Sequence, residues 1–375
     1  MKEIGVYIHI PFCKQKCLYC DFVSFANKQE LQKEYVEALK KEIENWKNNH
    51  KEYAVKTIYI GGGTPSYIES KYITEILKNI GEAKSITIEL NPGTVTKQKL
   101  IDYKNAGVNR LSIGLQSTSN RLLKQIGRIH DYNQFLETYN LAIEVGFDNI
   151  NVDLMIGLPN QSIKDIKESL EKICILNPEH ISVYSLIVEE NTPIHKLIEK
   201  GELQLLEEEN ERQMYWYVKN FLELKGYKHY EISNFAKTGF ESEHSMDCWE
   251  QKEYIGFGTA AHSYIDSKRF CNTSNIEEYI SNCKNEEFEK NVEILEIQNE
   301  EDKMREYMIL GLRKIDGVSI QKFEKEFNLN PIMLFKNELQ KLYEQKLIII
   351  DGNIIKLSNK GLDFANLVWE EFVWQ

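Results

Sequence analysis

Short runs of β-branched and aromatic residues alternate with stretches of helical apolar spacing from the start of the chain to about residue 190. The expected strands are 5–10, 56–62, 85–90, 110–115, 149–157 and 180–188, and the expected helices between them are 30–46, 67–80, 96–105, 132–145 and 162–176. Alternating strands and helices predict parallel pairing through right-handed crossovers. Several strands are almost continuous apolar runs, typical of a sheet covered on both faces. We therefore predict an α/β fold built as a partial (β/α)6 TIM-like barrel, with a doubly wound sheet as the alternative.

The second half of the chain has a different pattern. Residues 193–225 are rich in Glu and have helical spacing up to Gly226, whereas 227–244 is mixed and 254–264 is glycine-bearing and loop-like. From about residue 300 we expect helices at 300–313, 318–327, 332–346 and 359–373, with a hairpin at 347–357 that turns at Asp351-Gly352. This pattern resembles a winged-helix module. The predicted division is a core domain at 1–235, a connecting segment at 236–299 and a smaller C-terminal α+β domain at 300–375.

Composition and charge narrow the class of protein. The chain has 375 residues, is 42% hydrophobic and carries a net charge of -12, which argues against a general nucleic-acid-binding protein. We therefore expect the C-terminal domain to pack or to cover a substrate rather than to contact DNA. The N-terminus lacks the pattern of a signal peptide, and no run approaches about eighteen apolar residues. Three of the seven cysteines fall within eight residues, typical of a metal site in a reducing, cytoplasmic compartment.

Glycine and polar residues follow the expected strands. The cysteines come after the first strand and the glycines of residues 61–65 after the second, while Glu89 and Gln116 end the third and fourth and Asp153 lies within the fifth. The carboxyl ends of parallel strands form the functional edge of barrels and open α/β sheets. Turn formation alone explains Asn91 and Pro92 well. It does not explain three cysteines.

Cys13, Cys17 and Cys20 have the spacing C-x3-C-x2-C. Soft sulfur ligands select zinc, copper(I) or iron–sulfur clusters. A structural zinc ion normally takes four ligands, and His9 is the nearest candidate for the fourth. A four-iron, four-sulfur cluster on three cysteines would leave one iron open for a small ligand. The spacing alone leaves both possibilities open.

The residues around the cysteines resemble a known family. C-x3-C-x2-C on a loop after the first strand is the signature of radical-SAM proteins, and YIHIPFCKQKCLYCDF (7–22) resembles the branch that contains the anaerobic coproporphyrinogen dehydrogenases (HemN) and the haem chaperones (HemW). Further stretches that match are GGGTPS (61–66), ELNPGTV (89–95), RLSIGLQS (110–117), NVDLMIGLPNQ (151–161), YEISNFAK (230–237) and GLDFANLVWEEF (361–372). The resemblance therefore covers essentially the whole chain.

The resemblance implies two cofactors and the residues that hold them. A [4Fe-4S] cluster would be ligated by the three cysteines, and S-adenosylmethionine (SAM) would chelate its open iron. Family positions near SAM correspond here to Tyr7, Tyr19, Gly62, Gly63, Thr64, Glu89, Gln116, Arg128 and Asp153. Glycines let backbone approach a ligand closely, carboxylates accept bonds from ribose hydroxyls, and an arginine can meet a carboxylate. By itself, Arg128 would be assigned to a solvated surface, whereas an aspartate in an apolar strand such as Asp153 is costly unless paired or functional.

Two features favour the haem-chaperone branch. The dehydrogenases have a fourth cysteine two residues after the third, where this chain has Phe22, and a longer segment before the cluster. The chaperones carry a His-Asn-x-x-Tyr-Trp motif implicated in haem handling. Here His244 and Trp249 remain, but Ser245 and Cys248 replace Asn and Tyr. Histidine and cysteine are both haem ligands, so His244 is the candidate ligand, with His262 a weaker one.

Three functions compete at this point. The first is a haem chaperone that binds a [4Fe-4S] cluster, SAM and haem and passes haem to acceptor proteins. The second is an enzyme of porphyrin metabolism, either an oxygen-independent coproporphyrinogen III dehydrogenase or another radical-SAM enzyme. The third is a non-catalytic zinc module. We favour the first and assign no catalytic residue. Haem or porphyrin is the expected small-molecule partner, with no nucleic acid and no transmembrane segment.

Overall fold

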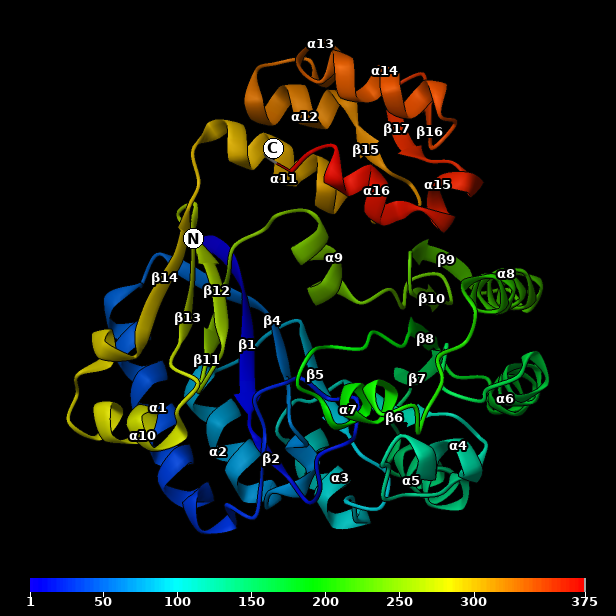
Figure 1. The fold of residues 1–375 in the computed structure, drawn as a ribbon. Helices are drawn as coiled ribbons and strands as arrows, with labels where there is room; N and C mark the ends of the chain where they lie inside the picture. Colours follow the sequence, from blue (N-terminus) through cyan, green and yellow to red (C-terminus); the bar gives the residue numbers. More distant parts are fainter. Residues whose placement is uncertain (374–375) are drawn as a thin grey trace.

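The computed structural model describes residues 1–373, and within this range twelve strands form one sheet (Figure 1). The order across the sheet is β14-β13-β12-β11-β1-β4-β5-β6-β7-β8-β10-β9. The strands are β1 (Lys2–Ile10), β4 (Tyr53–Gly62), β5 (Ser85–Leu90), β6 (Arg110–Gln116), β7 (Ile150–Ile156), β8 (His180–Ser185), β9 (Lys228–Glu231), β10 (Asn234–Ala236), β11 (Tyr254–Phe257), β12 (His262–Ile265), β13 (Lys268–Asn272) and β14 (Val292–Ile297).

The six strands of the central region are parallel and follow one another in chain order. β1 pairs with β4, and each next strand pairs with the one before it as far as β8. A doubly wound sheet would reverse direction at a switch point within this order. Because the order never reverses, the structure confirms the predicted partial barrel and excludes the doubly wound alternative. Beyond β1 and β8 the sheet continues instead of closing.

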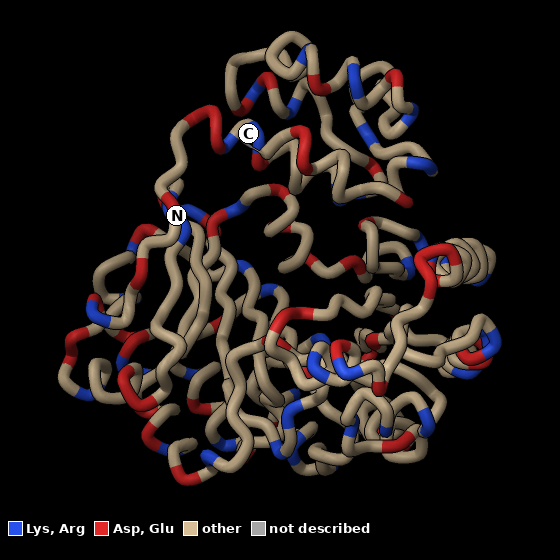
Figure 2. Tube along the Cα trace, in the orientation of Figure 1, with Lys and Arg blue, Asp and Glu red and all other residues tan. Residues whose placement is uncertain are grey.

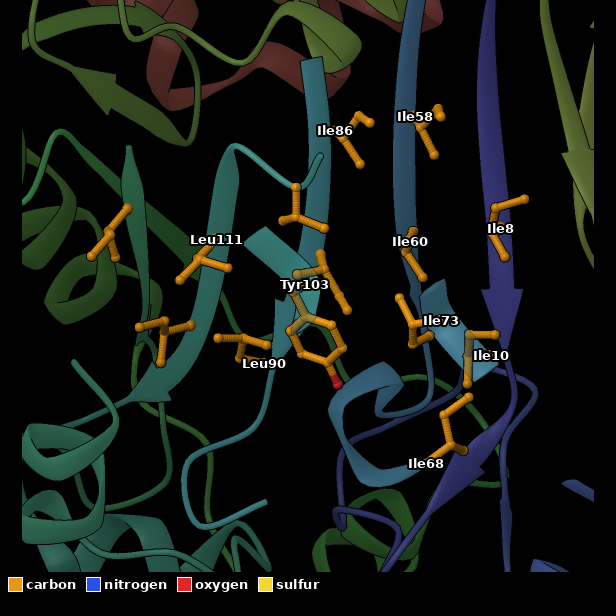
Figure 3. Packing of buried hydrophobic residues seen from close by; sticks show 14 of the residues in the cluster. Ile8, Ile10, Ile58, Ile60, Ile68, Ile73, Ile86, Leu90, Tyr103 and Leu111 are labelled. Carbon is orange, nitrogen blue, oxygen red and sulfur yellow. The ribbon is translucent and has the colours of Figure 1, made fainter. Parts of the chain in front are cut away.

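Helices cover the outer face of the parallel strands. They are α1 (Gln32–Asn49), α2 (Ser70–Ile80), α3 (Lys97–Asn105), α4 (Asn120–Gln125), α5 (Tyr132–Val145), α6 (Ile163–Leu176) and α8 (Glu208–Leu224). Figure 3 shows part of the apolar cluster to which Ile8, Ile58 and Ile60 of the strands, Ile73 of α2 and Tyr103 of α3 belong. All five side chains are buried. Side chains alternate along a strand, so the residues between these isoleucines face the barrel interior.

That interior is polar. Thr57 and Tyr59 of β4 alternate with Ile58 and Ile60, and Tyr59 pairs in register with Thr87 of β5. Glu89 of β5 and Asp153 of β7 share this inner face closer to the carboxyl ends of the strands. Burying such groups is costly unless they are hydrogen-bonded or serve a function. The inner face of the barrel is therefore where a functional site is expected.

Two expectations about the middle of the chain are wrong. The predicted single helix at 193–225 is two helices, α7 (Pro193–Glu199) and α8, because the backbone at Gly201 takes the left-handed conformation with φ 70°. The segment 254–264 is not a loop: it contains β11 and β12. The connecting segment also supplies α9 (Glu243–Trp249) and α10 (Ile276–Lys284), so residues 254–297 extend the main sheet.

The C-terminal unit has its own apolar core, which includes Met308, Phe323, Phe335, Leu342 and Phe372. Its elements are α11 (Glu300–Gly311), β15 (Val318–Ser319), α12 (Ile320–Phe327), α13 (Pro331–Leu334), α14 (Lys336–Glu344), β16 (Ile348–Asp351), β17 (Ile354–Leu357), α15 (Asn359–Asp363) and α16 (Ala365–Glu370). The predicted hairpin is confirmed as β16 and β17, whereas the predicted helix 359–373 is interrupted at Phe364. The unit lies beside α9, at the end of the barrel where the parallel strands begin (Figure 1).

Charged residues of both signs are interspersed along the outer helices and the C-terminal unit (Figure 2). Among residues 1–373 there is no helix with the length and apolar character needed to cross a membrane.

Candidate functional site

The cysteine loop lies at the carboxyl end of β1. Two short parallel strands, β2 (Phe12–Cys13) and β3 (Phe25–Ala26), close the loop on itself. The amide of Leu18 donates to the carbonyl of Ile126 at 3.0 Å, and the carbonyl of Leu18 accepts from the amide of Ile194 at 2.9 Å. The middle of the loop is thus tied to two distant segments of the chain. Such anchoring holds the three thiols in one region before any metal binds.

The three thiols line a cavity of about 440 Å³, within the roughly 300–1,000 Å³ typical of small-molecule sites. Eleven of the twelve residues predicted for the cluster and SAM meet here, although they come from segments far apart in the sequence. The predicted residues that line the cavity are Cys13, Cys17, Cys20, Tyr19, Gly62, Gly63, Thr64, Glu89, Gln116, Arg128 and Asp153. Tyr7 is the exception: its ring packs behind Tyr59, and its hydroxyl lies 3.0 Å from Nδ1 of His9.

The glycines after β4 allow a close approach of backbone segments. Gly62 has φ 108°, and a Cβ there would lie 2.6 Å from the imidazole of His9. At Gly63 a Cβ would lie 2.9 Å from the carbonyl oxygen of Ile10. Any side chain at either position would displace the strand end that carries the cysteine loop. The next residue, Thr64, lies with its hydroxyl 3.5 Å from the sulfur of Cys13.

Arg128 is a half-buried cation beside the thiols, not a fully solvated surface charge. Its guanidinium donates to the sulfur of Cys17 at 3.5 Å and also to Asn91 and the carbonyl of Gly114. Its Nε is buried and, among the described residues, has no acceptor. A buried donor without a partner costs free energy. The cavity therefore has a positive group next to the cysteines that suits a carboxylate.

Two acidic residues, Glu89 and Asp153, also line the cavity. Burial, together with the charge of Asp153, raises the pKa of Glu89 to about 7. Burial also raises the pKa of Asp153, whose oxygens accept from Asn151 at 2.7 Å and Ser112 at 3.3 Å. Two partly compensated negative groups in a buried site favour a cationic ligand. The cavity thus combines one cationic group, Arg128, with two acidic groups, Glu89 and Asp153.

Sequence reasoning missed Tyr59, which lines the cavity and donates its hydroxyl hydrogen to Glu89 at 2.9 Å. The signal was available in the alternation of β4. Tyr59 has the same parity as Thr57 and Gly61, opposite to the buried isoleucines, so it had to face the interior.

Residues 244–249, which retain the His and Trp of the haem-handling motif and are called the haem-motif remnant below, lie at the other end of the barrel. His244 on α9 is placed inside the barrel mouth, with Nδ1 2.8 Å from the hydroxyl of Thr57 and its ring stacked on Tyr59 at 5.4 Å. Burial lowers its pKa to about 4, so the imidazole is neutral. Burial raises the pKa of Cys248 to about 12. The ring of Trp249 stacks on the guanidinium of Arg313. In contrast, His262 is exposed on β12.

A partial parallel barrel with a three-cysteine loop at its carboxyl end and a bipolar cavity beside that loop defines a class of protein. The family model described as the radical SAM superfamily matches residues 7–173, and the model described as the HemN C-terminal domain matches residues 298–364. The fold is also that of a solved structure, the coproporphyrinogen III oxidase HemN from Escherichia coli, with a TM-score of 0.85 and 22% identity over 99% of this chain and 90% of that one.

Full-length relatives define the family more narrowly. The heme chaperone HemW of Bacillus subtilis is 38% identical over 98% of this chain and 99% of its own length, and that of Lactococcus lactis is 34% identical over 99% and 98%. A mitochondrial radical S-adenosyl methionine domain-containing protein 1 of Danio rerio is 30% identical over 96% and 84%. The chain belongs to the HemW family of radical SAM proteins.

This membership decides between the two metals that the cysteine spacing left open. Radical SAM proteins hold a [4Fe-4S] cluster and SAM, so these are the cofactors of the chain. The cavity fits them, because three thiols, a guanidinium and two carboxyl groups line it together. Reduction of the cluster supplies the electron that cleaves SAM in this superfamily. Burial raises the pKa of Cys20 to about 11, so the thiol releases a proton when it binds iron.

Proposed function

We propose that this protein is a haem chaperone: it binds haem and passes it to acceptor proteins. The observation that carries the proposal is the full-length match, at 34–38% identity, to proteins named heme chaperone HemW. The three-cysteine loop with Phe22 after it agrees with this branch. A reducing, cytoplasmic compartment is part of the proposal, since such a compartment keeps cluster-ligating thiols reduced.

The proposal assigns roles to the residues of the cavity. Cys13, Cys17 and Cys20 ligate three irons of the cluster, and Arg128 meets the carboxylate of SAM. Glu89 and Asp153 hold the ribose hydroxyls and offset the sulfonium charge. The backbone at Gly62 and Gly63, with Thr64, Gln116 and Tyr19, completes the enclosure. Tyr7 acts only indirectly, because it lies behind Tyr59. These assignments are supported by the shared cavity and by the charged groups that line it.

Haem ligation by His244 requires α9 to move. The imidazole is neutral, as an iron ligand must be, but it is enclosed between Thr57 and Tyr59. The proposal therefore includes withdrawal of α9 from the barrel mouth before iron is bound. Cys248, which replaces the tyrosine of the motif, is a protonated thiol in this arrangement and becomes a second possible ligand only after the same movement.

The test is a haem titration of the anaerobically reconstituted protein, followed by absorbance. We expect saturable binding by the wild type and weaker binding by His244→Ala. His262→Ala is the matched control, because this histidine is exposed and lies on another element. Equal binding by the wild type and His244→Ala would remove His244 from the account, and no saturable binding by the wild type would refute the chaperone.

An enzymatic role is the alternative, favoured by the fold shared with the coproporphyrinogen III oxidase. Reconstituted protein supplied with coproporphyrinogen III, SAM and a reductant distinguishes the two. The chaperone proposal expects no protoporphyrinogen, and sustained formation of that product would replace it with the enzyme.

A further inference from the structure

Three aromatic rings, those of Tyr7, Tyr59 and His244, are in contact inside the barrel. Tyr7 of β1 and Tyr59 of β4 are register partners, and their rings stack at 6.4 Å with 25° between the planes. The imidazole of His244 also stacks on Tyr59, at 5.4 Å with 28° between the planes. The Tyr59 ring thus contacts one ring from the neighbouring strand β1 and one from the helix α9.

Tyr59 connects the cysteine-loop end of the barrel, through Glu89, with the α9 end, through His244. Its hydroxyl donates to Oε1 of Glu89 at 2.9 Å, and Glu89 lines the cavity beside the cysteines. Its ring contacts the imidazole that α9 inserts from the opposite end. Burial raises the pKa of the tyrosine hydroxyl, and the charge of Glu89 raises it further, so the group stays protonated and keeps donating.

Two neighbours fix the position of His244: Gly5 has no side chain to fill the space, and Thr57 bonds the imidazole. A Cβ on Gly5 would be in contact with the imidazole at 3.4 Å, so the ring packs directly over the backbone of β1 at this glycine. Thr57 binds Nδ1 at 2.8 Å. Outside the barrel, Lys56 pairs with Asp247 at 2.8 Å and Glu243 at 3.4 Å, which anchors α9 to β4.

We propose that Tyr59 is a positioning residue: it orients the Glu89 carboxylate toward SAM, and His244 holds the tyrosine ring in the orientation that makes this bond. The inference rests on the proposed role of Glu89 in SAM binding. It deepens that role, because the helix that carries the haem-motif remnant then supports the SAM cavity from behind. Withdrawal of α9 would free the Tyr59 ring and loosen the carboxylate.

The test measures SAM binding to cluster-reconstituted protein without haem, by anaerobic equilibrium dialysis with radiolabelled SAM. Tyr59→Phe keeps the ring and removes only the bond to Glu89. We expect affinity to fall about tenfold, as when a hydrogen bond to a charged group is lost. The matched control is Tyr139→Phe, because this buried hydroxyl donates to the carbonyl of Leu176 at 3.0 Å on the outer layer, and its affinity should equal the wild type.

A double-mutant cycle separates positioning from a general structural effect. His244→Ala should weaken SAM binding alone but add nothing in the Tyr59→Phe background, because its effect passes through the tyrosine hydroxyl. His244→Phe keeps a flat ring against Tyr59 and should restore SAM binding. Independent, multiplying effects of the two substitutions, or unchanged affinity in Tyr59→Phe, would overturn the inference.

The variant Glu89→Gln distinguishes an error in the positioning role of Tyr59 from an error in the SAM-binding role of Glu89. If Glu89→Gln leaves SAM affinity unchanged, the assigned role of Glu89 is wrong and the inference falls with it. If Glu89→Gln weakens binding while Tyr59→Phe does not, only the positioning role is wrong. The electron paramagnetic resonance spectrum of the reduced cluster, with and without SAM, gives a second measure of the same binding.

Discussion

At the scale of the residue, the barrel interior places ionisable groups where burial controls their charge. Glu89 is the clearest case, since desolvation and Asp153 raise its pKa to about 7 while the bond from Tyr59 lowers it. The carboxyl therefore changes charge near neutral pH. An aspartate or glutamate on the surface would be ionised throughout this range.

The titration of Glu89 predicts a pH dependence for SAM binding. SAM is a cation at its sulfur, so it prefers the ionised carboxylate, which is depleted below the raised pKa and restored above it. We expect affinity to rise between about pH 6 and about pH 8. Equilibrium dialysis across this range measures the effect, and Glu89→Gln should flatten the profile. An equally steep profile in that variant would assign the dependence to another group.

At the scale of the element, local signals predicted the parallel half of the barrel well. The bounds of α5 match the expected 132–145, because Asp131 and Gln134 form a capping box and Gly146 ends the helix in the left-handed conformation. The strands β12 to β14 escaped notice because their pairing depends on partners far away in the chain. β14 in particular is exposed along its length, so it has no buried face to create a pattern.

The part of the candidate site that lies in recognisable sequence motifs was predictable. The cysteines and the residues that follow the strands were found from their positions, and the structure places them around one cavity. The location of His244 was not predictable, because nothing in a short polar segment indicates that α9 turns its histidine into the barrel. That fact depends on contacts between residues nearly two hundred positions apart.

The attachment of α9 gives a prediction for stability. Lys56 pairs with Asp247 and Glu243, and its side chain is 24% exposed, whereas Lys84 pairs with the same Glu243 but is 74% exposed. Lys56→Gln should lower the free energy of unfolding by about 1 kcal/mol. Chemical denaturation measures it, with Lys84→Gln as the control expected to change little. Equal effects would mean that solvent screens both pairs alike.

At the scale of the whole molecule, one arginine joins three parts of the chain. The guanidinium of Arg313 lies between the indoles of Trp249 on α9 and Trp369 on α16, at 4.3 and 4.9 Å from their centroids. It also faces the buried carboxylate of Glu231 at 4.0 Å. The C-terminal unit is thereby fastened to α9 and to the edge of the main sheet.

This contact predicts how the unit is held in place. Arg313→Ala removes both cation–π contacts and leaves Glu231 without that cation, so stability should fall by about 2 kcal/mol. Arg313→Lys keeps the charge without the planar stack and should recover only part of the loss. Thermal unfolding followed by calorimetry measures the stabilities, which should decrease from the wild type to Arg313→Lys to Arg313→Ala. If lysine restored full stability, charge alone and not stacking would account for the contact.

The cysteine loop and α9 occupy opposite mouths of the same barrel (Figure 1). A protein that docks at one mouth leaves the other free, so the two openings have separate footprints. Under the proposed function, an electron donor that reaches the cluster and a haem acceptor that reaches α9 would approach opposite ends of the barrel. Both can be engaged at once, and a three-protein assembly becomes a geometrically permitted state.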